Sequence, residues 1–393
     1  TNNFVLQQYR TISFPSRPAD LIVRDFTGDD LPDFITAVSA EREIWLFEAT
    51  GSLDNPFTIQ KLPVPIEPEY LAGGDINGDG FVDICALSYL DERLVVLMGD
   101  PDHHFTRTIE IPVPYYDLTR NLTYGRNQPL ACADTDQDSR HEIYILHEDD
   151  QGWPAIYQYA IQSVTAGPPV TTSRKLHLQG TAPREIQAMA FNDINQDGIP
   201  ELQIFTISNA SLVVYDRISA TEYQESIRFS LENTMFGNTV SGFTLSDATG
   251  DGFPDIVVVP FDGTIRLFSY QDGRLRHGTI GDLGEFAKHE DVLIADLDQD
   301  EKMDLLVVSH SKSGMAPYQQ ISVVCGEKPG EFKEAVTFPA NRLSTFFPLR
   351  LGAIDFDQDG LQDIFFLDIA AREAILFLNR SDASTAIPDW RFW

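Results

Sequence analysis

The sequence is poor in cysteine and in basic residues, and it has no long apolar run. Three cysteines, Cys85, Cys132 and Cys325, are too few to build a disulfide framework in 393 residues. Each lies in an apolar stretch, so we expect buried free thiols or a single Cys85–Cys132 bridge. No run approaches the ~18 apolar residues of a transmembrane helix. Only 28 Lys and Arg stand against 60 Asp and Glu, without a basic stripe, which argues against a nucleic-acid partner.

Catalytic motifs are also missing. The eight histidines are scattered, and none forms the helical His pair of a metalloprotease. The sequence has no nucleophile elbow, phosphate loop or dinucleotide fingerprint. We therefore expect a protein that is not an enzyme. The alternative is a polysaccharide-acting lyase or hydrolase whose site is assembled from distant loop residues.

What the chain does have is one acidic nine-residue stretch, repeated seven times. Each copy has Asp at position 1, Asp, Asn or Thr at position 3, Asp at position 5, and Asp or Glu at position 9. The copies begin 49 to 59 residues apart, and a period of this size predicts a repeat architecture. In chain order they are DFTGDDLPD (25–33), DINGDGFVD (75–83), DTDQDSRHE (134–142), DINQDGIPE (193–201), DATGDGFPD (247–255), DLDQDEKMD (296–304) and DFDQDGLQD (355–363).

This spacing predicts calcium sites. Oxygens at alternate positions of a tight loop converge on one point, where six to eight of them can surround a hard cation. Gly at position 6 of copies two, four, five and seven permits a left-handed turn. We expect up to seven structural Ca²⁺ ions in closed sites, with no open position for a substrate. The expected ligands are Asp25, Thr27, Asp29, Asp33, Asp75, Asn77, Asp79, Asp83, Asp134, Asp136, Asp138, Glu142, Asp193, Asn195, Asp197, Glu201, Asp247, Thr249, Asp251, Asp255, Asp296, Asp298, Asp300, Asp304, Asp355, Asp357, Asp359 and Asp363.

The seven copies differ in charge and in turn residues. Four copies have three carboxylates at these positions and three copies have four, twenty-four in all, so the sites account for most of the formal charge of −32. Position 6 is Asp30 in copy one, Ser139 in copy three and Glu301 in copy six, which makes those turns less relaxed. We expect occupancy first in copies two, five and seven, and least in copies one and three.

The segments between the copies predict an all-β fold. Each period reads as four short strands, with the acidic loop between the first and second, which is typical of one propeller blade. We expect a single seven-bladed β-propeller over 1–393, with blades near 20–63, 70–112, 129–180, 186–231, 242–282, 291–339 and 350–380. The spare strand Phe4–Ile12 is expected to close the last blade as its outer strand. The tail aromatics Trp390, Phe392 and Trp393 are expected to pack on the body.

With its signature at blade period, the chain resembles the FG-GAP/VCBS repeat family, whose blades also form the integrin α-subunit head. The resemblance covers nearly the whole chain and is stronger to the VCBS-like branch, since the Phe-Gly and Gly-Ala-Pro words are mostly absent. It implies ligands at positions 1, 3, 5 and 9. It also implies extracellular binding or cell adhesion, although some members act as lectins or accompany enzymes, and the fold does not decide among these.

The resemblance places a ligand surface on the face opposite the acidic loops. The longest connection expected there, 112–129, could bind a protein or glycan, or could fold over the central opening as a plug. Tyr and Arg are frequent at binding hot spots, and an exposed aromatic ring can stack on a sugar. The candidate ligand-binding residues are Tyr115, Tyr116, Arg120, Tyr124, Arg126, Trp153 and Tyr318.

Three features favour a secreted, periplasmic or cell-surface location. Calcium sites of modest affinity fill where calcium is about millimolar, which is outside cells. The chain begins with Thr1, which suggests processing that removed a signal peptide. Three sequons, at Asn121, Asn209 and Asn379, are compatible with secretion. The sequence indicates no particular oligomeric state.

Overall fold

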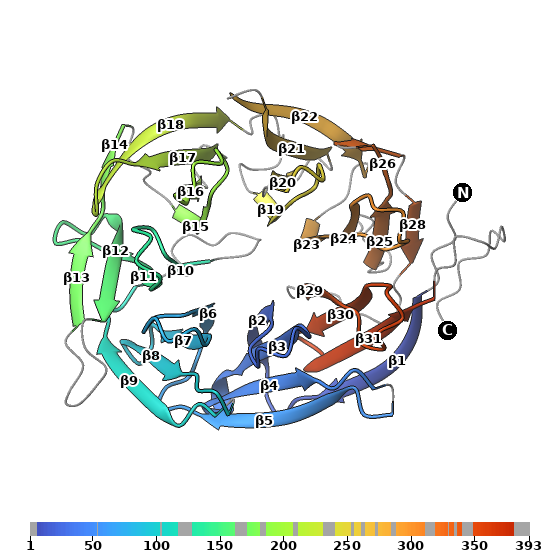
Figure 1. Ribbon diagram of the computed structural model, residues 1–393, viewed down its shortest axis with the longest axis horizontal. Helices are drawn as coiled ribbons and strands as arrows, with labels where there is room; N and C mark the ends of the chain where they lie inside the picture. Colours follow the sequence, from blue (N-terminus) through green and yellow to red (C-terminus); the bar gives the residue numbers. More distant parts are fainter. Residues whose placement is uncertain are drawn as a thin grey trace.

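The structure is a computed structural model (Figure 1). It describes residues 6–52, 54–102, 104–116, 128–161, 171–180, 186–206, 211–230, 240–252, 255–260, 264–271, 274–283, 288–310, 319–328, 330–333, 336–339 and 349–380. Arg120, Tyr124, Arg126, Tyr318 and the tail aromatics Trp390, Phe392 and Trp393 lie outside these ranges.

Seven antiparallel blades form a ring, and the first strand of each blade lies innermost (Figure 1). The strands of blades one to three are β2 (Pro18–Arg24), β3 (Asp33–Val38), β4 (Glu43–Ala49) and β5 (Phe57–Pro63); β6 (Tyr70–Gly74), β7 (Asp83–Ser88), β8 (Arg93–Met98) and β9 (Arg107–Pro112); and β10 (Leu130–Ala133), β11 (Glu142–Glu148), β12 (Pro154–Ile161) and β13 (Thr171–Lys175).

Blades four to seven continue round the ring. Their strands are β15 (Ile186–Asn192), β16 (Glu201–Thr206), β17 (Ser211–Arg217) and β18 (Glu222–Ser230); β19 (Val240–Ser246), β20 (Asp255–Pro260), β21 (Thr264–Gln271) and β22 (Arg274–Asp282); β23 (Lys288–Ala295), β24 (Asp304–His310), β25 (Gln319–Val324) and β28 (Val336–Pro339); and β29 (Leu349–Ile354), β30 (Asp363–Asp368), β31 (Glu373–Asn379) and β1 (Leu6–Ser13). The expected all-β, seven-bladed fold is confirmed. Apart from one short 3-10 turn, η1 (Ser39–Glu41), the elements in these ranges are strands.

The chain closes the ring with its own beginning. Strand β1 pairs antiparallel with β31, from Leu6 opposite Asn379 to Ser13 opposite Glu373. In Figure 1 the blue β1 lies along the outer side of the red β31. The sequence prediction that the first strand completes the last blade is therefore confirmed, and this pairing removes an open sheet edge.

Two short additions depart from a plain four-stranded repeat. Strand β14 (His177–Gln179) pairs in parallel with β18, so blade four has a fifth strand. The sequence analysis ended blade three at residue 180, but this segment joins the sheet of the next blade. A small hairpin, β26 (Gly326–Lys328) with β27 (Glu331–Phe332), follows the third strand of blade six.

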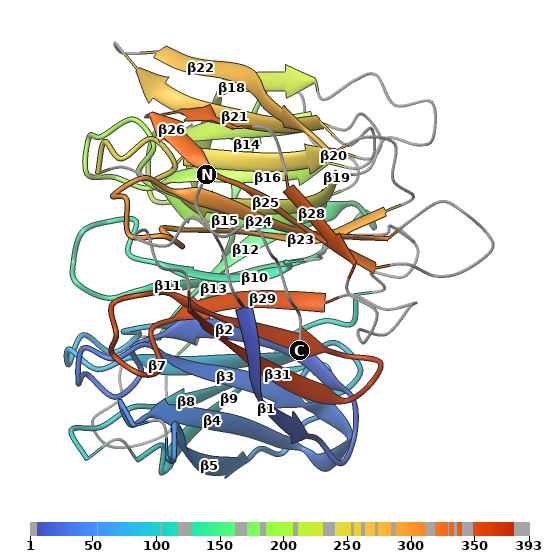
Figure 2. The same cartoon turned by 90° about the vertical axis from the view of Figure 1, so that its right-hand side faces the viewer.

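The core lies between neighbouring blades. The strand after each acidic loop is buried on both faces, as its apolar sequence predicts, and β3, β7, β16 and β30 are buried along their whole length. Phe34 of blade one packs against Phe365 of blade seven with ring centroids 4.2 Å apart. The side view in Figure 2 shows the blades stacked around the ring with connections at both rims. Each acidic loop is therefore held by a rigid strand on each side.

All three cysteines are free, and Cys85 Sγ lies 3.6 Å from Cys132 Sγ across blades two and three. A disulfide bond needs about 2.05 Å, so these sulfurs are in contact without a disulfide bond.

Within the part of the chain that the structure describes, no helix has the length and apolar character that a membrane crossing requires.

Candidate metal centres

The acidic loops are named loop one to loop seven in chain order, and loop two (75–83) shows their common backbone. Asp75 Oδ1 accepts the amides of Gly78 (2.7 Å) and Asp79 (3.2 Å), and Asp75 Oδ2 accepts the amide of Gly80 (2.8 Å). Asp79 Oδ1 accepts the amide of Phe81 at 3.0 Å. These bonds curl the loop around its own first carboxylate, and each oxygen keeps lone pairs for another partner.

The position 9 carboxylate ties the loop to the blade. Asp83 Oδ2 accepts the Ile76 amide and Asp83 Oδ1 accepts the Gly99 amide, both at 2.8 Å. Asp83 is fully buried. Position 9 of the other loops makes the same bond to the position 2 amide, with Glu at the end of loops three and four. The sequence analysis assigned position 9 to the metal alone and missed this structural role.

Two positions of each loop adopt the left-handed backbone. Position 6 does so in Gly80, Gly198, Gly252 and Gly360 and also in the three copies without glycine, where φ is 67° for Asp30, 70° for Ser139 and 63° for Glu301. The left-handed turn expected at position 6 is thus confirmed in every copy. Position 4 has positive φ as well, which the sequence analysis did not anticipate. It holds Gly28, Gly78, Gln137, Gln196, Gly250, Gln299 or Gln358.

Neighbouring loops contact one another, so the loops share one face of the ring. Gln137 Nε2 of loop three donates to the Gly198 carbonyl of loop four at 2.7 Å. The His141 amide of loop three donates to the Asp75 carbonyl of loop two at 2.7 Å. Position 4 glutamine therefore has a second use, because its long side chain reaches the next blade.

In four loops, three carboxylates each bring one oxygen within 4.8 Å of the others. The groups are Asp134, Asp136 and Asp138; Asp193, Asp197 and Glu201; Asp296, Asp298 and Asp300; and Asp355, Asp357 and Asp359. Calcium binds oxygens at roughly 2.3 to 2.6 Å, so ligands around one ion lie within about twice that distance. The oxygen-only donor set and this spacing fit a hard divalent cation. Loops one, two and five have Thr27, Asn77 or Thr249 at position 3.

Asp298 in loop six is the best single indication of a missing positive charge. It is 5% exposed, and neither carboxylate oxygen makes a well-formed hydrogen bond within the described residues. The nearby amide of Asp300 bonds instead to Asp296 Oδ1 at 3.2 Å. Burial, followed by the charges of Asp300 and Asp296, raises the pKa of Asp298 to about 6. A buried carboxylate without a donor is costly, and a cation at the loop centre would relieve that cost.

The position 9 carboxyls have raised pKa values for the same reason. Burial raises the pKa of Asp83, Glu201, Asp304 and Asp363 to about 7, and that of Asp33 and Asp255 to about 6, against the opposing effect of their backbone hydrogen bonds. Neighbouring loop carboxylates add to the increase. A bound cation favours the ionised form, so it would stabilise the charge pattern that the loops contain.

A cavity of about 310 Å³ opens beside loop three, lined by Asp136, Asp138, Arg140, Gln158 and Arg174 among others. The cavity mixes both signs of charge, so it suits a small polar group.

A separate acidic group outside the loops contains Asp100, Asp102 and His104, which follow β8. Asp100 Oδ1 accepts the amides of Asp102 and His104, both at 2.9 Å. Asp100 therefore caps its own turn, and the sequence analysis did not single out this group.

The opposite face carries the candidate ligand-binding residues that the structure describes. Tyr115, which follows β9, is 50% exposed, and Trp153, in the turn between β11 and β12, is 52% exposed. Tyr116 is 5% exposed with its ring centroid 5.8 Å from that of Tyr89, so its ring is packed and offers little surface to a partner. Leu90, in the turn between β7 and β8, is 67% exposed on this face and was missed.

Comparison with known proteins supports the repeat architecture. A model of the FG-GAP-like repeat matches residues 247–307, which include loops five and six. This match and the seven-bladed ring fit the FG-GAP/VCBS resemblance. No curated protein gives a significant match. The chain is similar to a structure described as BBS1N in complex with ARL6DN, soaked with lead, with 10% identity, coverage of 95% of this chain and 96% of that chain, and a TM-score of 0.53. At that identity the similarity shows the fold alone.

Proposed function

We propose that this seven-bladed propeller, which carries an FG-GAP-like repeat, is an extracellular binding module stabilised by calcium. Its ligand is a protein or a glycan, bound on the face away from the acidic loops. The observation that carries the proposal is a difference in sequence and exposure between the two faces of the ring. Similar acidic loops line one face, whereas the connections on the other differ and expose large side chains such as Tyr115 and Trp153.

Calcium has a structural role in this proposal. Positions 1, 3, 5 and 9 would hold the ion, and the residues that fit it best are the loop carboxylates with buried or crowded oxygens, Asp298 above all. A bound ion would supply positive charge to loop carboxylates that have no cationic partner within the described residues, such as Asp298. In this proposal the ion holds the loop in shape and takes no part in chemistry, which agrees with a binding module. Millimolar calcium outside cells would keep sites of moderate affinity filled.

A protein ligand is supported by the character of the exposed residues and by the fold comparison. Tyr and Trp bury a large area at small entropic cost and are enriched at interface hot spots. BBS1N, whose fold is similar, was solved in complex with ARL6DN. This face also has polar residues, and Arg42, Glu67 and Asp91 among them form a small group of ion pairs. Such a group is typical of the polar rim that surrounds the apolar centre of a protein interface.

A glycan ligand is the second candidate, and Trp153 favours it. A half-exposed indole can stack on the face of a sugar ring while neighbouring carboxylates accept its hydroxyl protons. The polar cavity beside loop three is a second place of suitable size and chemistry, lined mainly by blade three with Ile76 of blade two and Ala220 of blade four. A lectin of this kind would place its sites on or between blades.

The test is a glycan array of the purified chain in millimolar calcium and again in chelator. Selective binding of related sugars in calcium supports the lectin. A blank array from folded protein, followed by capture of a partner that Tyr115→Ala or Trp153→Ala weakens, supports the protein ligand. The matched control is Ile59→Ala, because Ile59 is 43% exposed on the outer strand β5, away from this face. Equal loss from the control would contradict the assigned surface.

A further inference from the structure

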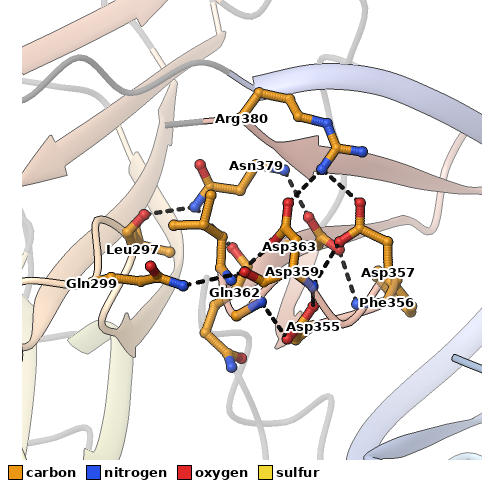
Figure 3. A network of polar contacts seen from close by, with 12 residues as sticks. Leu297, Gln299, Asp355, Phe356, Asp357, Asp359, Gln362, Asp363, Asn379 and Arg380 are labelled. Carbon is orange, nitrogen blue, oxygen red and sulfur yellow. Dashed lines mark hydrogen bonds and ion pairs between the residues drawn. The ribbon is translucent and has the colours of Figure 1, made fainter. Parts of the chain in front are cut away.

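Loop seven (355–363) contains a positive charge supplied by the protein itself. Arg380 Nη1 lies 2.5 Å from Asp357 Oδ2 and 2.7 Å from Asp359 Oδ2 (Figure 3). These carboxylates are positions 3 and 5 of the loop, two of its expected metal ligands. The Asp357 side chain is only 4% exposed, so its charge is largely removed from water. One guanidinium nitrogen thus lies between two oxygens that an ion in this loop would need.

The fold places Arg380 there through the end of β31. The Asn379 amide donates to Asp363 Oδ1 at 2.7 Å, and the Asn379 side chain donates to the carbonyls of Leu297 (2.6 Å) and Gln362 (3.1 Å). Figure 3 shows these contacts beneath the arginine. Because three hydrogen bonds hold Asn379 in place, the next residue starts from a well-defined position above the loop.

Other blades have a different residue at this place. The amide that bonds to position 9 comes from Ala49 in blade one, Gly99 in blade two and Gly326 in blade six, as it comes from Asn379 in blade seven. The residues that follow these four are Thr50, Asp100, Glu327 and Arg380. In this set only blade seven offers a cation, and blades two and six offer an acid.

Loop six shows that a nearby cation alone is not enough. Lys302 Nζ contacts Asp300 Oδ2 at 2.6 Å, but within the described residues both oxygens of the buried Asp298 at position 3 make no well-formed hydrogen bond. Lys302 therefore forms no ion pair with the position 3 carboxylate of loop six, whereas Arg380 contacts positions 3 and 5 of loop seven together.

The Arg380 nitrogen and a calcium ion compete for the same oxygens. Calcium binds oxygens at roughly 2.3 to 2.6 Å, and Arg380 Nη1 lies at the similar distances of 2.5 and 2.7 Å from the same oxygens. A guanidinium keeps its charge at any relevant pH, and its hydrogen bonds to carboxylates are among the strong ones. Because it is tethered to the blade, its effective concentration at the loop is high.

We propose that Arg380 is the resident cation of loop seven and excludes a divalent ion from it. This reverses the expectation from sequence that loop seven would be among the first occupied. It places the calcium-independent loop in the blade that closes the ring, where β1 pairs with β31. The closure is then maintained when calcium is withdrawn from the other blades. The contrast with those blades rests on the proposed calcium binding of the other loops.

The experiment counts calcium ions per chain, by equilibrium dialysis of metal-stripped protein with radioactive calcium, for the wild type, Arg380→Gln and Arg372→Gln. Arg372 is the control because it precedes the other end of β31, where its Nη1 donates to the Pro15 carbonyl at 3.2 Å. We expect Arg380→Gln to bind one more ion than the wild type, and Arg372→Gln to bind the same number. Equal numbers in all three proteins would overturn the proposal.

A second comparison does not require the Arg380 variant to fold. Asp359→Asn in loop seven should leave the wild-type number unchanged, whereas Asp79→Asn in loop two should lower it by one. A loss of one ion in both variants would overturn the proposal for Arg380.

The proposed function is judged separately. A wild type that binds no calcium contradicts it, and a gain of one ion by Arg380→Gln against that background still supports the role of Arg380.

Discussion

Loops two and seven share one backbone and differ in what balances their charge. In both, position 1 accepts the amides of positions 5 and 6, and position 9 accepts the amides of position 2 and of a residue in or just after the third strand. Loop two has Asn77 at position 3 and three carboxylates. Loop seven has Asp357 there, and Arg380 contacts it. The same nine-residue pattern therefore supports two ways of neutralising a loop, and the cation can come from outside the pattern.

The comparison also separates two roles of the carboxylates. Positions 1 and 9 accept backbone amides through both carboxylate oxygens in both loops, so they shape the loop whether or not an ion is present. Position 5 accepts a backbone amide through Oδ1, in Asp79 and in Asp359. The difference lies in Oδ2 of Asp357 and Asp359, which faces Arg380 in loop seven, whereas no ion pair reaches Asp79 within the described residues. Two loops with the same backbone shape therefore need not both bind an ion.

Removal of calcium should have the largest effect on stability, and it should destabilise loop two more than loop seven. Each site with calcium at a hundredfold over its Kd adds about 2.7 kcal/mol of stability, so loss of several sites should lower the Tm by on the order of 10 °C. Differential scanning calorimetry in millimolar calcium and in chelator measures this. Hydrogen exchange under the same conditions should rise in 70–98 around loop two and change little in 349–380. An unmoved Tm would contradict structural calcium.

Loss of the position 9 carboxylate should affect both loops alike. Asp83→Ala and Asp363→Ala each leave two backbone amides without their acceptor. At about 1 to 3 kcal/mol for each buried unsatisfied group, we expect each variant to lose roughly 2 to 6 kcal/mol, in chelator as well as in calcium. Denaturant unfolding measures the loss. A cost that appears only in calcium would show that position 9 acts solely as a metal ligand.

Transfer of the arginine should make loop two resemble loop seven. Asp100 follows Gly99 as Arg380 follows Asn379, so Asp100→Arg places a guanidinium above loop two. We expect one calcium fewer per chain. Because Asp100→Ala loses the same two amide contacts of Asp100, the stability in chelator should lie within about 1 kcal/mol of that variant, the scale of a partly exposed ion pair. Asp100→Ala is the control, since it removes the same carboxylate without adding a cation. If both variants lose one ion, the loss comes from Asp100 and not from the arginine.

Substitutions on the opposite face should leave both loops unchanged. Tyr115→Ala and Trp153→Ala remove half-exposed side chains, so we expect changes in unfolding free energy within about 0.5 kcal/mol and an unaltered calcium number. Tyr116→Ala, which removes a buried ring, should cost about 3 kcal/mol. Thermal unfolding and equilibrium dialysis measure both quantities. A change of calcium number in Tyr115→Ala would contradict the separation of the two faces.

Much of the fold could be predicted because its signals are local. The spacing of Asp75, Asn77, Asp79 and Asp83 specifies a loop whose bonds lie within a few residues, and the apolar run after each loop predicts a strand buried on both sides. The closure by β1 could be predicted from counting strands, since blade seven lacked one. The left-handed backbone at Gln299 and Gln358 was missed because glutamine gives no signal for positive φ.

The sequence by itself determined the repeat, the acidic loops and the position of each loop between two strands, because these depend on residues near one another in the chain. Only the tertiary structure decided which groups meet across longer distances. Arg380 reaches Asp357 because β31 ends above loop seven. Strand β14 joins the next blade, and Tyr116 packs against Tyr89 while Tyr115 remains exposed. These outcomes depend on where the strands end in space, which the assembled ring sets and no local pattern records.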